Sequence, residues 1–218
     1  KAMKEIIEKK YKRFDVSVIP FGVDTNYFKL NNKPNTKFTI GIIKSIESYN
    51  GVECIIEAAD LIVNKLKKEI YFVIVGQGSL KKTMEEKVDK LNLKKNFNFT
   101  GFIQHDDIYQ YYKKLNVFVA PSTREGFGVS VLEAASTGIP SITSNVGGLK
   151  EVNIHNQTGF VIPPNNPEML AKYILKLYDD NVLREQLGLN ARKFVQENFS
   201  WKKNVKQMVN IYNNFCQQ

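Results

Sequence analysis

The features that decide the fold stand together in one stretch of the sequence, Val117-Phe118-Val119-Ala120-Pro121-Ser122-Thr123-Arg124-Glu125-Gly126-Phe127-Gly128-Val129-Ser130-Val131-Leu132-Glu133-Ala134. Its opening residues, Val117–Ala120, are a continuous apolar run, the pattern of a strand that is covered by helices on both faces. A loop with Gly126 and Gly128 follows, and a helical pattern covers Val129–Ser136. The stretch therefore predicts a strand, a loop and a helix, the repeating unit of an α/β fold.

The same alternation extends along most of the chain. We expect further strands at Val16–Ile19, Phe38–Ile43, Ile70–Val75, Phe97–Thr100, Ser141–Thr143 and Phe160–Ile162. We expect further helices at Val52–Lys67, Leu80–Leu91, Asp106–Lys114, Glu168–Leu177, Val182–Glu197 and Lys202–Phe215. Strand–helix–strand repetition with short links predicts right-handed crossovers. The expected fold class is thus α/β, with a Rossmann-like, doubly wound parallel sheet.

Length and composition limit the architecture. The 218 residues, 43% of them hydrophobic, suffice for one well-buried core. No apolar run approaches the length of a transmembrane helix. Cys54 and Cys216 match no metal-binding or redox spacing, so we expect two reduced thiols, which favours the cytoplasm. Because the sequence begins at Lys1 and shows no signal peptide, we expect a piece of a longer protein.

The net charge of +9 is compatible with an anionic partner, which could be nucleic acid, an anionic membrane or a phosphate-bearing ligand; the alternative is that the lysines are spread over solvated helix faces. No zinc-finger or RRM signature accompanies the charge, so we expect no nucleic acid. One basic cluster opens the chain: Lys1, Lys4, Lys9, Lys10, Lys12 and Arg13. This cluster is either a peripheral contact with the inner face of a membrane or a solvated helix face.

Functional residues should follow the strands, because ligands of such sheets bind at the carboxyl ends of the strands. The helix that begins after Gly128 offers its first amides to a diphosphate. Glu125 and Glu133 flank these amides, and carboxylates are suited to sugar hydroxyls rather than to phosphate. We interpret Glu125 as a partner of a transferred sugar and Glu133 as a partner of a ribose. Taken singly, Glu125 could cap a turn and Glu133 could complement the helix dipole.

A second glycine loop, Gly76-Gln77-Gly78-Ser79, follows the strand at Ile70–Val75. It lacks the third glycine and the downstream acidic residue of a dinucleotide fingerprint. A tight strand-to-helix turn and a direct role near a nucleotide both remain open for it. An NAD-dependent oxidoreductase is accordingly a weak alternative for the whole chain.

Glu125 and Glu133 resemble the E-x7-E motif of retaining glycosyltransferases of the GT-B fold, family 4, which is also called group 1. Further motifs that resemble this family follow in the same order: Val18-Ile19-Pro20-Phe21-Gly22-Val23-Asp24, Gly138-Ile139-Pro140-Ser141-Ile142, Gly147-Gly148-Leu149-Lys150-Glu151-Val152 and Gln157-Thr158-Gly159-Phe160-Val161-Ile162-Pro163-Pro164. The resemblance covers nearly the whole chain. It implies the C-terminal, donor-binding domain, which is one half of a GT-B fold.

The resemblance also implies roles for particular residues. Glu125 would be catalytic, contacting hydroxyls of the donor sugar, and Glu133 would bind the ribose. The segment Gly126-Phe127-Gly128-Val129 would hold sugar and diphosphate through its amides, and Phe102 and Ile103 would lie along the base. Further donor-binding candidates are Gly22, Gly76 and Gly78. The implied donor is a UDP-, GDP- or ADP-sugar, with no cofactor and no metal ligand.

The family pattern has two cations near the leaving diphosphate, and this sequence supplies only the first. By the resemblance, Lys44, after the first strand of the main sheet, would be the catalytic cation that stabilises the leaving diphosphate; a solvated loop lysine is the alternative. A second lysine is expected near Ser48 or Tyr49, and neither residue is basic. Loss of one charge-assisted contact costs about 1.5–3 kcal/mol. A degenerate, non-catalytic nucleotide-sugar-binding or interaction domain is therefore the alternative function.

The resemblance divides the chain into three parts. Residues 1–34 would be the end of an acceptor domain and a linker, and residues 35–199 the nucleotide-sugar-binding domain. Residues 200–218 would be a helix that packs back toward the missing N-terminal domain. The parent enzyme would transfer a hexose to a glycan or lipid-linked acceptor that the missing domain binds. We expect the 218-residue chain alone to bind donor weakly and to transfer nothing.

Overall fold

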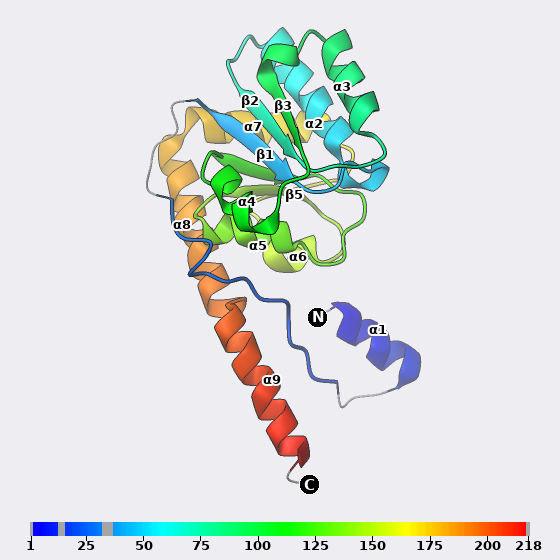
Figure 1. The fold of residues 1–218 in the computed structure, drawn as a ribbon, viewed down its shortest axis with the longest axis vertical. Helices are drawn as coiled ribbons and strands as arrows, with labels where there is room; N and C mark the ends of the chain where they lie inside the picture. Colours follow the sequence, from blue (N-terminus) through cyan, green and yellow to red (C-terminus); the bar gives the residue numbers. More distant parts are fainter. Residues whose placement is uncertain (1, 13–15, 32–36, 217–218) are drawn as a thin grey trace.

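The computed structural model describes residues 2–12, 16–31 and 37–216. Its centre is a six-stranded parallel sheet with the order β3-β2-β1-β4-β5-β6 (Figure 1). The strands are β1 (Thr39–Ile43), β2 (Tyr71–Val75), β3 (Phe97–Gly101), β4 (Val117–Ala120), β5 (Ser141–Ser144) and β6 (Gly159–Ile162). The strand order reverses between β1 and β4, which are neighbours in the sheet. This reversal is the point where ligands of doubly wound sheets bind.

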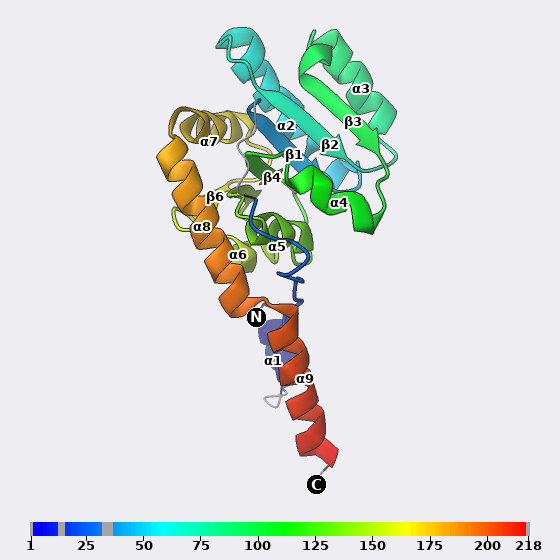
Figure 2. The same ribbon diagram turned by 60° about the vertical axis from the view of Figure 1, so that its left-hand side comes forward.

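Helices cover both faces of the sheet, as Figures 1 and 2 show. One face carries α2 (Val52–Ala59), the π-helix η2 (Asp60–Lys65), α3 (Lys81–Lys90) and α7 (Pro167–Asp179). The other face carries α4 (His105–Tyr112), α5 (Val129–Ser136), α6 (Leu149–Val152) and α8 (Asn181–Asn198). Within β4, Val117 and Val119 pack on the first face, and Phe118 and Ala120 on the second. Burial on both sides explains the continuous apolar run, and the predicted fold class is confirmed.

Local signals set the ends of several helices. The side chain of Asn166 accepts a 2.8 Å hydrogen bond from the Met169 amide at the start of α7, and Asp180 caps α8 in the same way. α5 ends before Gly138, which has a φ of +79°. The helix predicted at Val52–Lys67 differs, because its second half is a π-helix in which the Leu66 amide bonds to the carbonyl of Leu61 at 3.1 Å.

The strand predicted at Val16–Ile19 is wrong. Residues 16–22 contain no regular structure and run outside the sheet, and the side chain of Val18 is 42% exposed. A strand needs a neighbouring backbone to complete its hydrogen bonds, and the first such contact comes at Val23, which pairs with Ser200 in an isolated bridge. The apolar run is therefore a connection. Of residues 1–34, which we expect to be the end of an acceptor domain and a linker, positions 1, 13–15 and 32–34 lie outside the described residues.

Two helices extend beyond the sheet and its covering layers. α1 (Ala2–Tyr11) lies apart from the sheet in both views, and α9 (Trp201–Cys216) continues away from α8 (Figures 1 and 2). A helix at α1 was not among the predicted elements, although a solvated helix face was one interpretation of the basic cluster there. No helix in the described ranges is both long and apolar enough to cross a membrane. Cys54 is buried and Cys216 exposed, and both are free thiols as predicted. Burial raises the pKa of Cys54 to about 12.

Candidate functional site

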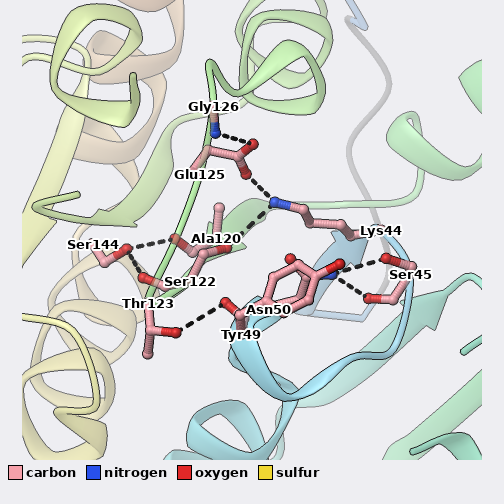
Figure 3. A network of polar contacts seen from close by, with 10 residues as sticks. All are labelled: Lys44, Ser45, Tyr49, Asn50, Ala120, Ser122, Thr123, Glu125, Gly126 and Ser144. Atoms are coloured by element: carbon pink, nitrogen blue, oxygen red, sulfur yellow. Dashed lines mark hydrogen bonds and ion pairs between the residues drawn. The ribbon is translucent and has the colours of Figure 1, made fainter. Parts of the chain in front are cut away.

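Two loops meet at the carboxyl edge of the sheet because β1 and β4 are neighbours. Lys44 directly follows β1, and Glu125 lies in the loop after β4. The ammonium group of Lys44 forms an ion pair with Oε2 of Glu125 and donates a 3.4 Å hydrogen bond to Oγ of Ser122 (Figure 3). The side chains of Lys44 and Glu125 are only 20% and 15% exposed. The structure thus joins the two predicted catalytic residues at the point where the strand order reverses.

The loop that carries Lys44 is braced by the glycine loop after β2. The Lys44 amide donates to the carbonyl of Val75 at 2.9 Å. A Cβ on Gly76, whose φ is +142°, would lie 2.0 Å from the carbonyl oxygen of Lys44. A Cβ on Gly78 would lie 2.3 Å from that of Ile46. These contacts support the interpretation as a tight turn, in which both glycines position Lys44; their contact with a ligand remains a prediction.

A pocket of about 860 Å³ opens beside the Lys44–Glu125 pair. Its lining includes the whole segment from Gly126 to Ser130, at the start of α5. In the described part of the chain no side chain caps α5, which begins after Gly128. The first amides of α5 therefore lie at the pocket without a side-chain partner, next to a cation. This combination suits an anionic group.

The backbone of the Glu125 loop packs against a third loop, which contains Gly147 and Gly148. The Gly148 amide donates a 3.3 Å hydrogen bond to the carbonyl of Glu125. A Cβ on Gly147 would lie 1.8 Å from the same oxygen. The Glu125 side chain is also anchored, because its Oε1 accepts a 3.2 Å hydrogen bond from the Gly126 amide. Both loops line the pocket, so its floor is set by backbone packing.

Glu133, the second glutamate of the motif, lies in a different environment. Its side chain is 8% exposed, and it does not line the pocket. The hydroxyl of Tyr112 donates a 2.7 Å hydrogen bond to its Oε2. Burial raises the pKa of Glu133, while the hydrogen bond from Tyr112 and the charge of His105 act in the opposite direction. The predicted ribose-binding carboxylate is thus held inside the domain, between α4 and α5.

The other predicted residues do not all gather at the pocket. Phe102 and Ile103 follow the edge strand β3 and precede α4, the helix that also carries Tyr112; the Phe102 side chain is 66% exposed and Ile103 is half-buried. Gly22 lies against the start of α9, where an added Cβ would approach Cα of Trp201 to 2.7 Å. This close approach to the helix backbone explains the glycine at position 22 without a ligand.

Three residues that lie beside the predicted site residues were not identified from the sequence. Ser122 is fully buried beneath Lys44, and Tyr112 is the hydroxyl partner of Glu133. The guanidinium of Arg124 lies over the ring of Tyr49, with Cζ 5.2 Å from its centroid. Each of these contacts joins residues far apart in the sequence, so spacing gave no signal for them. The residues that the structure describes include no group of His, Cys, Asp and Glu side chains that could hold a metal ion.

The sheet, its reversal between β1 and β4 and the polar groups gathered there define a Rossmann-like domain with an edge suited to an anionic ligand. A family model described as "Glycosyl transferases group 1" matches residues 23–194, and the chain belongs to this family. The predicted relationship to GT-B glycosyltransferases is confirmed.

Relatives and solved structures agree with this assignment. The chain is 31% identical over 210 residues to an uncharacterised glycosyltransferase of Methanocaldococcus jannaschii, covering 90% of this chain and 53% of the relative. It is 30% identical to the UDP-Gal:alpha-D-GlcNAc-diphosphoundecaprenol alpha-1,3-galactosyltransferase of Escherichia coli, covering 90% and 54%. The structure of sucrose-phosphate synthase from Thermosynechococcus elongatus superposes with a TM-score of 0.88 at 27% identity, covering 99% of this chain and 57% of that one. The chain therefore spans about half the length of these proteins.

Proposed function

We propose that this chain is the donor-binding domain of a retaining glycosyltransferase that takes a nucleotide-diphospho-sugar. The observation that carries the proposal is the Lys44–Glu125 ion pair beside the start of α5. It brings a cation, a carboxylate and helix-start amides to one pocket, and these are the groups that a sugar diphosphate requires.

The diphosphate would bind between Lys44 and the first amides of α5. Its negative charge is attracted both by the ammonium group and by the partial positive charge of the helix start. As the bond to the sugar breaks, charge builds up on the leaving diphosphate, and the same groups stabilise it. The chain's own contribution is thus electrostatic and comes from groups that are already in position.

Glu125 would bind hydroxyls of the transferred sugar. In the structure its Oε2 is taken by Lys44 and its Oε1 by the Gly126 amide, so its position is fixed before a donor arrives. A bound diphosphate would compete for Lys44 and release Oε2 to a sugar hydroxyl. Glu133 would take the ribose after a rearrangement of its contact with Tyr112, and Phe102 and Ile103 would lie along the base.

The name of the Escherichia coli relative supports a UDP-hexose donor and a lipid-linked acceptor for that protein, and we extend this class of reaction to the parent of the present chain. The transferred group would be a hexose and the acceptor a glycan or a lipid-linked sugar. Retention of the anomeric configuration belongs to the same proposal, as does the binding of the acceptor by a domain outside this chain.

Isothermal titration calorimetry of the chain with UDP, GDP and ADP tests donor binding. One of the three should bind, and Lys44→Ala should weaken that binding by about tenfold or more, because a charge-assisted contact to phosphate is lost. Lys172→Ala is the matched control, since it removes an exposed lysine of α7 on the other face of the sheet. Absence of binding for all three nucleotides, or equal affinity in Lys44→Ala, would contradict the proposal.

One observation favours a second candidate, a degenerate domain that binds nucleotide sugars without catalysis. The charge of Lys44 is neutralised by Glu125, and the loop after β1 carries no second lysine near Tyr49. Turnover by the full-length parent protein separates the two functions. Loss of turnover in Glu125→Ala supports the enzyme, whereas normal donor binding by an inactive wild-type parent supports the degenerate domain.

A further inference from the structure

A second hollow of about 590 Å³ lies next to the donor pocket and shares Lys44, Glu125 and Gly126 with it. Its remaining lining comes from the loop after β1, including Tyr49, and from Arg124 in the loop after β4. The Thr123 amide donates a 2.8 Å hydrogen bond to the carbonyl of Tyr49. The Thr123 hydroxyl donates a 3.4 Å hydrogen bond to the same oxygen (Figure 3), so the two loops are tied together. The hollow is therefore a continuation of the donor pocket toward Arg124.

Arg124 and Tyr49 form a cation–π pair across these loops. Cζ of Arg124 lies 5.2 Å from the centroid of the Tyr49 ring, within the distance at which a guanidinium is attracted to an aromatic face. The ring restricts the conformations of a long side chain that would otherwise be free in solvent. The pair thus keeps a positive charge at the rim of the hollow.

The two cations differ in whether a neighbouring carboxylate compensates their positive charge. The charge of Lys44 is compensated by its ion pair with Glu125. Within the described residues Arg124 has no salt bridge, so its charge is available to a ligand. A guanidinium also offers a planar fork of donors that matches two phosphate oxygens, which an ammonium group cannot do.

We propose that Arg124, held on the ring of Tyr49, is the second cation that binds the donor diphosphate, together with Lys44 in the lining of the same hollow. This assignment rests on the proposed donor-binding function and adds a residue to it. The loop after β1 carries no second cation besides Lys44, and the loop after β4 supplies it as Arg124. The ring of Tyr49 supports the side chain of Arg124. A diphosphate that bridges Lys44 and Arg124 would have its charge compensated from both loops.

Titration with nucleotides of different phosphate content tests the proposal. The diphosphate that binds the wild-type chain is compared with the nucleoside of the same base. Arg124→Ala should weaken diphosphate binding by about ten- to a hundredfold, the range for a charge-assisted contact, and leave nucleoside binding unchanged. Lys114→Ala is the matched control, because it also removes an exposed cation stacked on a tyrosine, 5.0 Å from the ring of Tyr111 on α4.

Variants at position 49 test separately whether the ring of Tyr49 holds the side chain of Arg124. Tyr49→Phe keeps the aromatic face and should retain the affinity, whereas Tyr49→Ala should lower it by less than Arg124→Ala does. Tyr49→Lys, introduced together with Arg124→Ala, should restore part of the lost affinity, because it returns a cation to the same hollow. A purely structural role of Arg124 would not be rescued in this way.

The outcomes separate this inference from the function on which it rests. If the wild type binds a diphosphate and Arg124→Ala binds it equally well, the inference is overturned and the donor site stands. If Arg124→Ala loses affinity for nucleoside and diphosphate alike, Arg124 acts on the fold and the inference is again wrong. If the wild type binds none of UDP, GDP and ADP, both the proposed function and the inference fall.

Discussion

The hydroxyl of Tyr112 on α4 donates a 2.7 Å hydrogen bond to Oε2 of Glu133 on α5, and both side chains lie in the core. A buried carboxylate is costly unless it is hydrogen-bonded, so this contact decides whether Glu133 is tolerated in the domain. It also links α4 to α5, the two helices that follow the predicted base-binding segment and the Glu125 loop.

Tyr112→Phe should destabilise the protein by about 1–3 kcal/mol, because it leaves Oε2 of a buried carboxylate without its donor. The ring is kept, so its edge contact with Phe28, at 5.6 Å between centroids, should persist. Urea unfolding followed by circular dichroism measures the change. Tyr109→Phe is the control: its hydroxyl bonds at the surface to the carbonyl of Lys29, and its loss should cost about 0.5 kcal/mol or less. Equal effects of the two substitutions would contradict this account.

The stability of the domain should depend on pH through Glu133. Folding raises the pKa of this carboxyl above its ordinary value of 4.5, chiefly because burial penalises the charged form. The native state then binds the proton more tightly than the unfolded state. The contribution of Glu133 to the free energy of unfolding therefore falls as pH rises from 4.5 through the raised pKa.

Glu133→Gln tests this dependence, because glutamine keeps an acceptor for Tyr112 and does not titrate. The free energy of unfolding of the wild type minus that of Glu133→Gln should decrease as pH rises through this window. Urea titrations of both proteins at a series of pH values give the difference, in which the other titrating groups largely cancel. A difference that is constant, or that increases with pH, would show that Glu133 is not buried in this way.

Gly76→Ala should destabilise the protein by more than about 1 kcal/mol, since Gly76 has a positive φ and an added Cβ would meet the carbonyl of Lys44 at 2.0 Å. Displacing this carbonyl also moves Lys44, so nucleotide affinity should fall. Gly126→Ala is the control for stability, because a Cβ there meets no heavy atom within 4 Å among the described residues. If both variants unfold at the urea concentration of the wild type, the brace between the loops after β1 and β2 is not rigid.

The two thiols should differ in reactivity. Burial raises the pKa of Cys54 to about 12, so at pH 8 almost none of it is the reactive thiolate, and the side chain is also inaccessible. Cys216 is exposed. Iodoacetamide should therefore add once to the native protein, at Cys216, and a second time only in urea. Mass spectrometry of tryptic peptides distinguishes the sites, and rapid labelling of native Cys54 would contradict its burial in α2.

The layered α/β fold could be predicted from the sequence alone, because a strand that is covered by helices on both faces consists mainly of apolar residues. β2 and β4 are continuous apolar runs, β1 is apolar after Thr39, and such runs do not depend on the order of strands in the sheet. The position of α5 was predicted to the residue, since Gly128 and Gly138 mark its two ends. The mostly apolar run Val16–Ile19 resembles these strands in sequence, but it forms no strand, because none of the strands in the described ranges of the chain pairs with it.

What the sequence by itself determined was the class of fold and the local chemistry of one loop: a glutamate, a glycine turn and the start of a helix between Glu125 and Glu133. Only the tertiary structure decided what that loop meets. Lys44 and Arg124 reach the site from loops after β1 and β4, and these loops are neighbours because of the strand order, which no local pattern encodes. The burial of Glu133 against Tyr112 has the same origin. Contacts between distant segments depend on how the sheet and the helices pack on each other, and the spacing of residues along the chain does not predict this packing.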